Sequence, residues 1–147
     1  MDVVIQHPKV EDEKSFIFLS QELSRFNRRH HPQADSFEKV LRERADRASR
    51  LFCSSDPHQL ILMAKAGNRD VGYALAFVVH PDPSSDNGTQ LCGFLDEVYV
   101  DESVRGLGIG RQLIDDCLQW IRCQGARRVY EKRGFVQYAV SFEKTLD

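Results

Sequence analysis

The residues best suited to chemistry form a short glycine-rich loop between an apolar strand and an amphipathic helix. The loop reads Arg105-Gly106-Leu107-Gly108-Ile109-Gly110-Arg111, with an arginine at each end. The first backbone N–H groups of a helix have no partner within the helix, and together with the helix dipole they attract anions. Alternate glycines let the backbone approach an oxygen closely, and arginine adds charge suited to phosphate. The loop therefore predicts a pyrophosphate site, with an ordinary glycine-rich turn as the alternative.

Two other phosphate-binding motifs do not fit this loop. The dinucleotide fingerprint G-x-G-x-x-G, counted from Gly106, places its last glycine at Arg111, and no βαβ unit with a later acidic residue follows. The Walker loop requires Gly-Lys followed by Ser or Thr, a tripeptide that the sequence lacks. The site is therefore of neither type.

Hydrophobic periodicity places the loop within a single α/β domain that spans residues 1–147. A first helix begins near residue 11 and ends in the basic, proline-terminated segment 28–32. A turn at residues 67–70 predicts an antiparallel hairpin, and residues 81–88 form a polar loop. The other predicted helices cover residues 36–49 and 110–123, and the predicted strands cover residues 3–6, 60–66, 71–79, 91–100 and 136–146.

The loop and its flanks resemble a known family. Residues 100–110 look like the acetyl-CoA signature of the GNAT superfamily of N-acetyltransferases. Residues 130–135, Tyr-Glu-Lys-Arg-Gly-Phe, resemble the segment that closes the same fold, and weaker similarity runs from residue 3 to the end. The resemblance implies an α/β fold with a mixed, mostly antiparallel sheet flanked by helices.

The resemblance also implies a reaction and the residues that perform it. Acetyl-CoA would be the co-substrate, with no metal, and the acceptor amine would attack its thioester directly. Tyr130 would protonate the leaving thiolate, although a core aromatic residue with a satisfied hydroxyl is an equal alternative. Val98, Tyr99 and Val100 would contact the pantetheine arm. The pyrophosphate would be bound by Arg105, Gly106, Leu107, Gly108, Ile109, Gly110 and Arg111.

Asp96 and Glu97 precede the loop on the same predicted strand. Successive strand residues point to opposite faces, so we expect the two carboxylates to serve different roles. The pair resembles the acidic pair of polyamine and amino-acid acetyltransferases in the superfamily, where a carboxylate deprotonates or orients the amine. Both residues are therefore candidate catalytic groups, with solvated strand carboxylates as the alternative.

The chain is shorter than the family pattern between Ala126 and Tyr130. Only Arg127-Arg128-Val129 stand where the pattern has a fifth strand, a short loop and the start of a final helix. We therefore expect the fifth strand and part of the last helix to be absent. If the sheet stays open, its exposed edge favours a homodimer formed by strand exchange, which the particle mass in solution would test. If the segment is remodelled instead, Tyr130 loses its reach to the thiolate.

Composition and charge limit the remaining possibilities. The net charge of −2 gives no overall attraction to nucleic acid, and no segment is long and apolar enough to predict a membrane span. The four cysteines form no C-x-x-C pair, and His30 and His31 have no convergent third ligand, so no metal site is expected. Unpaired cysteines and an amino terminus unlike a signal peptide predict a cytoplasmic protein.

Two classes of function follow from these observations. The first is an acetyl-CoA-dependent N-acetyltransferase that acts on a primary amine of a small molecule such as a polyamine or amino acid. The second is a truncated relative that binds CoA with weak or no catalysis, and a protein N-acetyltransferase shares the same cofactor site. Turnover separates the first class from the second, because a binder alone releases no free thiol.

Overall fold

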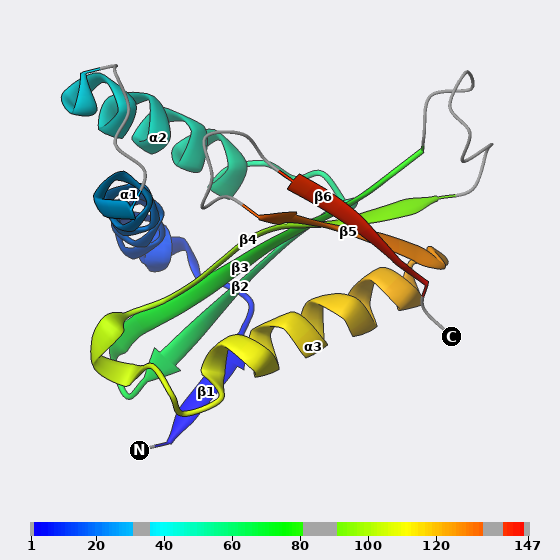
Figure 1. Cartoon of the computed structure of the whole chain (residues 1–147). Helices are drawn as coiled ribbons and strands as arrows, with labels where there is room; N and C mark the ends of the chain where they lie inside the picture. The colour runs from blue at the N-terminus through cyan, green and yellow to red at the C-terminus, as the bar shows by residue number, and fades with distance from the viewer. Residues whose placement is uncertain (1, 31–35, 81–90, 134–139, 146–147) are drawn as a thin grey trace.

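A six-stranded sheet forms the centre of the molecule, and helices cover both of its faces (Figure 1). The computed structural model describes residues 2–30, 36–80, 91–133 and 140–145. The strands are β1 (Val3–Gln6), β2 (Gln59–Ala66), β3 (Arg69–Val79), β4 (Cys92–Val100), β5 (Arg128–Arg133) and β6 (Val140–Thr145). The helices are α1 (Glu13–His30), α2 (Phe37–Phe52) and α3 (Ile109–Cys123), with short 3-10 turns η1 (Val10–Asp12) and η2 (Glu102–Val104).

The strands lie side by side in the order in which they occur in the chain. Every neighbouring pair is antiparallel except β4 and β5, which are parallel. The β2–β3 hairpin turns at Gly67, whose φ of +63° suits the first central position of a type II′ turn. The predicted mixed, mostly antiparallel sheet flanked by helices is confirmed.

One face of the sheet packs against α3. Ile109, Leu113, Cys117 and Ile121 recur at every fourth position of this helix, and all four are buried. Such spacing places them along one side of the helix. The helix approaches β4 closely, because a Cβ built on Gly93 would lie 2.3 Å from Cγ2 of Ile121. The position of the loop that leads into α3 is therefore fixed by a packed core.

The other face packs against α1 and α2, which Figure 1 shows on the side of the sheet opposite α3. Phe16 and Leu19 of α1 and Ala48 of α2 are buried there. The ring of Phe16 meets that of Tyr73 on β3 edge-on, with 5.2 Å between the centroids. This second core positions α2 over the middle strands.

The expected absence of a fifth strand is wrong. Residues Arg128–Arg133, predicted to lie beyond the missing strand, themselves form β5 and fill the place beside β4. A strand edge carries unpaired N–H and C=O groups, and the next extended segment of the chain satisfies them. In the part of the chain that the structure describes, no helix follows α3.

The remaining elements agree with the sequence to within a few residues at their ends. The last predicted strand is observed over Val140–Thr145. Residues 136–139 and 146, and the predicted loop at 81–88, lie outside the described residues. The described strands leave β1 and β6 as the two outer strands of the sheet. The homodimer stays a prediction.

A buried charge pair ties the start of α1 to the sheet. The Asp12 carboxylate accepts hydrogen bonds from the Lys65 ammonium on β2, at 2.6 Å, and from the Lys9 N–H, at 2.7 Å. Burial alone would raise the pKa of Asp12, but these donors and the charge of Lys65 hold it below its usual value. The ionised carboxylate is therefore favoured in the folded protein.

This pair predicts a pH-dependent contribution to stability. Because the pKa of Asp12 is lower in the folded than in the unfolded chain, its contribution is complete above the unfolded value of 3.8 and is lost as pH falls through the folded value. Asp12→Asn should lower the free energy of unfolding at pH 7 by roughly 1–3 kcal/mol. Urea titrations from pH 7 to 3 should show the difference from wild type shrinking at low pH, and a constant difference would contradict the pairing.

Candidate active site

The loop after β4 is held in shape by a capped turn and two glycines. The Asp101 carboxylate accepts a hydrogen bond of 3.0 Å from the Ser103 N–H, and this bond is the main cause that lowers the pKa of Asp101. Gly106 and Gly108 adopt φ of +83° and +82°, in the left-handed region that side chains rarely enter. Since Gly108 is also the N-cap of α3, the chain turns directly from the loop into the helix.

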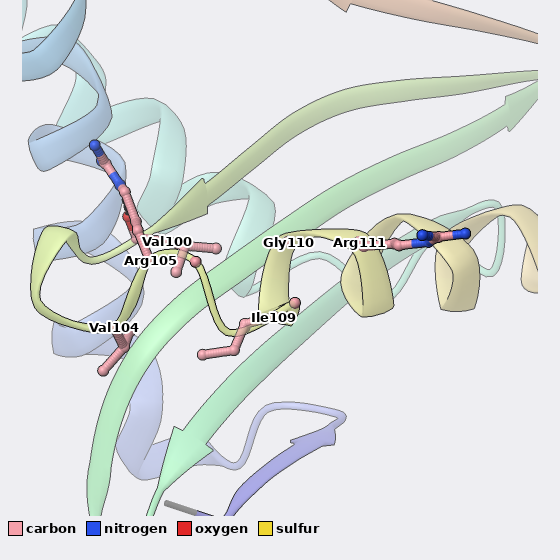
Figure 2. Close-up of a pocket in the computed structure, with 8 residues that line it drawn as sticks. Val100, Val104, Arg105, Ile109, Gly110 and Arg111 are labelled. Atoms are coloured by element: carbon pink, nitrogen blue, oxygen red, sulfur yellow. Dashed lines mark hydrogen bonds between the residues drawn. The ribbon is translucent and has the colours of Figure 1, made fainter.

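These residues surround a cavity of about 290 Å³ at the N-terminus of α3 (Figure 2). The first N–H groups of the helix lack helical partners there, and the helix dipole adds positive charge. A Cβ at Gly106 or Gly108 would meet no atom within 4 Å, so the space beside the loop is open. The cavity is lined by Val100, Val104, Arg105, Gly106, Gly108, Ile109, Gly110 and Arg111.

Most of the predicted cofactor residues line this cavity, but three do not. The Leu107 side chain is 62% exposed at the tip of the loop. Val98 packs against the core under α3, whereas Tyr99 is buried in the core under α1 and α2. Val104 lines the cavity without having been predicted, and its burial beside the loop was not evident from the local pattern.

The two flanking arginines reach the cavity but point in different directions (Figure 2). The Arg105 side chain turns back, donates from Nε to the Val100 carbonyl at 2.8 Å, and lies 5.0 Å from the ring centroid of Phe26 on α1. The exposed Arg111 side chain lies along α3. Arg105 therefore links the loop to α1, whereas the exposed side chain of Arg111 is less restricted by contacts within the protein.

Beyond the cavity, β4 and β5 separate. The two strands pair only over Cys92–Leu95 of β4, so the ladder between them ends before Asp96. Within the described residues, β4 has no neighbouring strand on this side from Glu97 to Val100. This unpaired edge leads from the point of separation to the glycine-rich loop.

Asp96 and Glu97 lie on the same side of the sheet, which corrects the expectation that they face opposite ways. The β3–β4 register shifts between Leu75 and Ala76, so that Asp96 is an extra residue on β4. A bulge of this kind re-aims side chains. Arg47 of α2 therefore reaches both carboxylates, with Nη2 at 2.9 Å from Asp96 Oδ2 and Nη1 at 3.0 Å from Glu97 Oε2.

Glu97 is the more buried of the two carboxylates and has three donors. Besides the hydrogen bond from Arg47, Nη1 of Arg44 lies 2.7 Å from Glu97 Oε2, and the hydroxyl of Tyr73 donates to Glu97 Oε1 at 2.7 Å. Burial and the charge of Glu97 raise the pKa of Tyr73 well above its usual value, so the hydroxyl keeps its proton and donates. Burial alone would lower the pKa of Arg44, but the nearby charge of Glu97 raises it, and the pKa of Arg44 lies above its usual value overall.

Sequence reasoning missed Arg44, Arg47 and Tyr73. A signal existed for the arginines, because residues three positions apart share one side of a helix. Nothing in the local pattern indicated that this side of α2 faces the acidic pair, since that contact depends on how the helix packs on the sheet. Tyr73 stands within the apolar strand predicted over residues 71–79, where its type and spacing indicate no role.

Tyr130 lies on β5, within the part of the strand that pairs with β4. It is opposite Phe94 in register, and the two rings stack with centroids 5.3 Å apart and planes inclined by 23°. Its neighbour Val129 is buried in the core under α3, so Tyr130 points to the opposite face, which carries Glu97. The structure thus brings Tyr130 and the acidic pair to one face of the sheet.

The described residues contain neither a cluster of metal ligands nor a membrane-spanning helix. No group of three or more His, Cys, Asp or Glu side chains converges as a metal site would require. No described helix combines the length and apolar character needed to cross a membrane. The cavity beside α3 and the neighbouring charged cluster are thus the features on which a functional interpretation rests.

Comparison with known proteins agrees with this geometry. The sequence profile of the acetyltransferase (GNAT) family matches residues 18–137. A PaiA N-acetyltransferase from Thermoplasma acidophilum, solved in complex with coenzyme A, superposes with a TM-score of 0.72 at 15% identity, covering 90% of this chain and 80% of that one. A search of curated proteins found no match.

Two further solved structures share the fold and differ in their acceptors. A ribosomal-protein-alanine N-acetyltransferase from Brucella melitensis biovar Abortus 2308 has a TM-score of 0.62 and 20% identity, covering 89% of this chain and 79% of its own. An aminoglycoside acetyltransferase from an uncultured soil metagenomic sample, in complex with sisomicin, has a TM-score of 0.60 and 17% identity, covering 89% and 77%. At these identities the likeness concerns the fold alone.

The left-handed glycine at the start of α3 gives a direct test of the loop. Gly108→Ala should lower the free energy of unfolding by roughly 1–2 kcal/mol, because a Cβ is disfavoured at φ of +82° even where space is available. Gly110→Ala is the matched control, since its Cβ would meet only Val100 Cγ2 at 3.6 Å. Denaturant unfolding of both variants measures the effect, and equal stability would contradict the assigned loop conformation.

Proposed function

Because this chain belongs to the acetyltransferase (GNAT) family, we propose that it transfers the acetyl group of acetyl-CoA to a primary amine of a small molecule. The proposal rests on two structural features that adjoin each other. A cavity lies at the N-terminus of α3, and an unpaired strand edge leads away from it to the point where β4 leaves β5. A cofactor with a pyrophosphate and a long amide-bearing arm fits that arrangement.

In the proposed complex the cofactor lies along β4. The N–H groups at the start of α3 hold the pyrophosphate, together with Arg111. Main-chain groups of Val98 and Val100 pair with the amides of the pantetheine arm, because the adjoining edge of β4 has no β5 partner. Val100 lies four positions after Asp96, a span of roughly 13 Å that brings the thioester towards the separation point.

The proposed reaction is a direct transfer. The lone pair of the neutral amine attacks the thioester carbon, a C–N bond forms and the C–S bond breaks. The thiolate takes a proton from the Tyr130 hydroxyl, and the amine nitrogen loses a proton to solvent, from which Tyr130 is reprotonated. The products are the N-acetyl amine and CoA with a free thiol. Tyr130 is suited to this step because it shares a face of the sheet with the acidic pair.

In the proposed complex, Asp96 and Glu97 line the acceptor site. Each already accepts hydrogen bonds from arginine, and Glu97 also accepts one from Tyr73. These bonds occupy carboxylate oxygens that could otherwise accept a proton from the amine. We therefore assign the two residues an electrostatic and positioning role towards the amine.

One observation favours a second function, that of a CoA-binding protein with little catalysis. Within the described residues, the elements after α3 are the strands β5 and β6, and no helix follows α3. The resemblance places Tyr130 in a final helix, after the first half of that helix, whereas here Tyr130 is a strand residue. If the hydroxyl lies out of reach of sulfur, binding persists and turnover is lost.

Cofactor binding is tested by calorimetric titration of the protein with acetyl-CoA. We expect saturable binding that Arg111→Ala weakens by about tenfold or more, through loss of a charge-assisted contact to phosphate. Arg122→Ala is the control, because Arg122 is exposed at the other end of the same helix. A folded wild-type protein that does not bind acetyl-CoA would overturn the proposal.

Catalysis is tested by release of free CoA thiol across a panel of amines, amino acids and peptides. Tyr130→Phe should reduce kcat by about a hundredfold or more and leave the affinity for acetyl-CoA unchanged, because the ring and its stacking on Phe94 remain. An unchanged kcat would make Tyr130 a core aromatic residue. Binding without turnover of any acceptor would support the CoA-binding alternative, and turnover of peptides alone would assign a protein acceptor.

A further inference from the structure

The acidic pair beside the proposed thioester site is already occupied by a cation from the chain itself. Arg47 spans Asp96 and Glu97, with one guanidinium nitrogen on each carboxylate. Together with Arg44, which contacts Glu97, two positive charges face two negative charges. The cluster is therefore neutral overall.

The two arginines differ in how firmly they are held. Arg44 is 18% exposed and makes further contacts through its Nε to the Ser20 carbonyl, at 3.1 Å, and through Nη2 to the Tyr73 hydroxyl, at 3.4 Å. Arg47 is 35% exposed, and its guanidinium contacts the two carboxylates. Arg44 is thus an internal anchor, whereas Arg47 closes the cluster on its solvent side.

We propose that Arg47 is a specificity-determining residue, which occupies the acidic pair in place of an acceptor's second positive charge. The inference rests on the proposed acetyltransferase function and narrows its substrate class. It assigns the site to acceptors whose reacting amine is their only positive charge, namely monoamines and amino acids. Polyamines are disfavoured.

The reason is electrostatic. A second ammonium of a polyamine would gain from the carboxylates only by displacing Arg47, which would lose two charge-assisted hydrogen bonds of 2.9 and 3.0 Å. If the polyamine leaves Arg47 in place, it meets a like charge that disfavours its approach. An acceptor with a single amine has no second ammonium, so it neither displaces Arg47 nor brings a second positive charge towards it. A carboxylate near that amine could also pair with the exposed guanidinium of Arg47.

The location of the cluster makes this effect relevant to the reaction. Asp96 is the first residue of β4 beyond its pairing with β5, where the proposed thioester lies. Its side chain is 16% exposed, so it is partly open to an incoming acceptor. Glu97 lies deeper, at 7% exposure, behind Arg47 and Arg44.

The test compares spermidine with a monoamine and glycine as acceptors, for wild type and Arg47→Gln. Wild type should acetylate the monoamine or glycine with the higher kcat/KM. Arg47→Gln should raise the ratio of spermidine to monoamine kcat/KM by roughly tenfold or more, since the acidic pair becomes available to the second ammonium. Arg50→Gln, which removes an exposed charge from the same helix, should leave the ratio unchanged.

Binding supplies a readout that does not depend on catalysis. Calorimetric titration with spermidine in the presence of CoA should give tighter binding to Arg47→Gln than to wild type or Arg50→Gln. A wild-type preference for spermidine, or a folded Arg47→Gln variant with wild-type selectivity and spermidine affinity, would overturn the inference. If no amine is acetylated, the proposed function fails while the spermidine titration still decides the role of Arg47. If Arg47→Gln does not fold, the acceptor preference of wild type decides it.

Discussion

The brevity of the pairing between β4 and β5 is the constraint on which the site depends. Parallel strands that stayed paired along their full length would close the edge of β4 and leave no backbone groups for a ligand. Here the pairing stops at Leu95, and the extra residue at Asp96 disturbs the β3–β4 register at the next position. A bulge bends its strand and increases the local twist, so β4 beyond Asp96 diverges from β5. One irregularity thereby opens the edge that leads to the glycine-rich loop.

The same bulge creates an electrostatic problem that α2 solves. Regular alternation would send one carboxylate to each face, but the bulge places Asp96 and Glu97 together, with Glu97 buried. Two unpaired carboxylates in such a position would be strongly unfavourable. Arg44 and Arg47 compensate them and, in doing so, tie α2 to the sheet. Buried ion pairs add little net stability against apolar packing, so their value here lies in fixing geometry.

The fold and the glycine-rich loop could be predicted from the sequence because both are encoded locally. The apolar stripe of α3 and the alternation of the central strands repeat at periods that a single segment reveals. The bulge could not be predicted, because it is defined by the register of β4 against β3 rather than by the composition of β4. The contact between Arg47 and Asp96 could not be predicted for a similar reason, because it joins residues 49 positions apart. β5 was missed because its charged residues gave Arg128–Arg133 no apolar run.

The observed β5 alters what family resemblance can transfer to this chain. A motif fixes residue types, whereas a role depends on where the fold places them. Tyr130 keeps its motif neighbours but takes its position from two strand ladders, against β4 and β6, instead of from a helix. The acidic pair keeps its sequence but is neutralised by Arg44 and Arg47. In the family resemblance, acetyl-CoA recognition relies on backbone groups and glycine conformations, so these changes affect it least. The choice of acceptor depends on side chains near the acidic pair, so these changes affect it most.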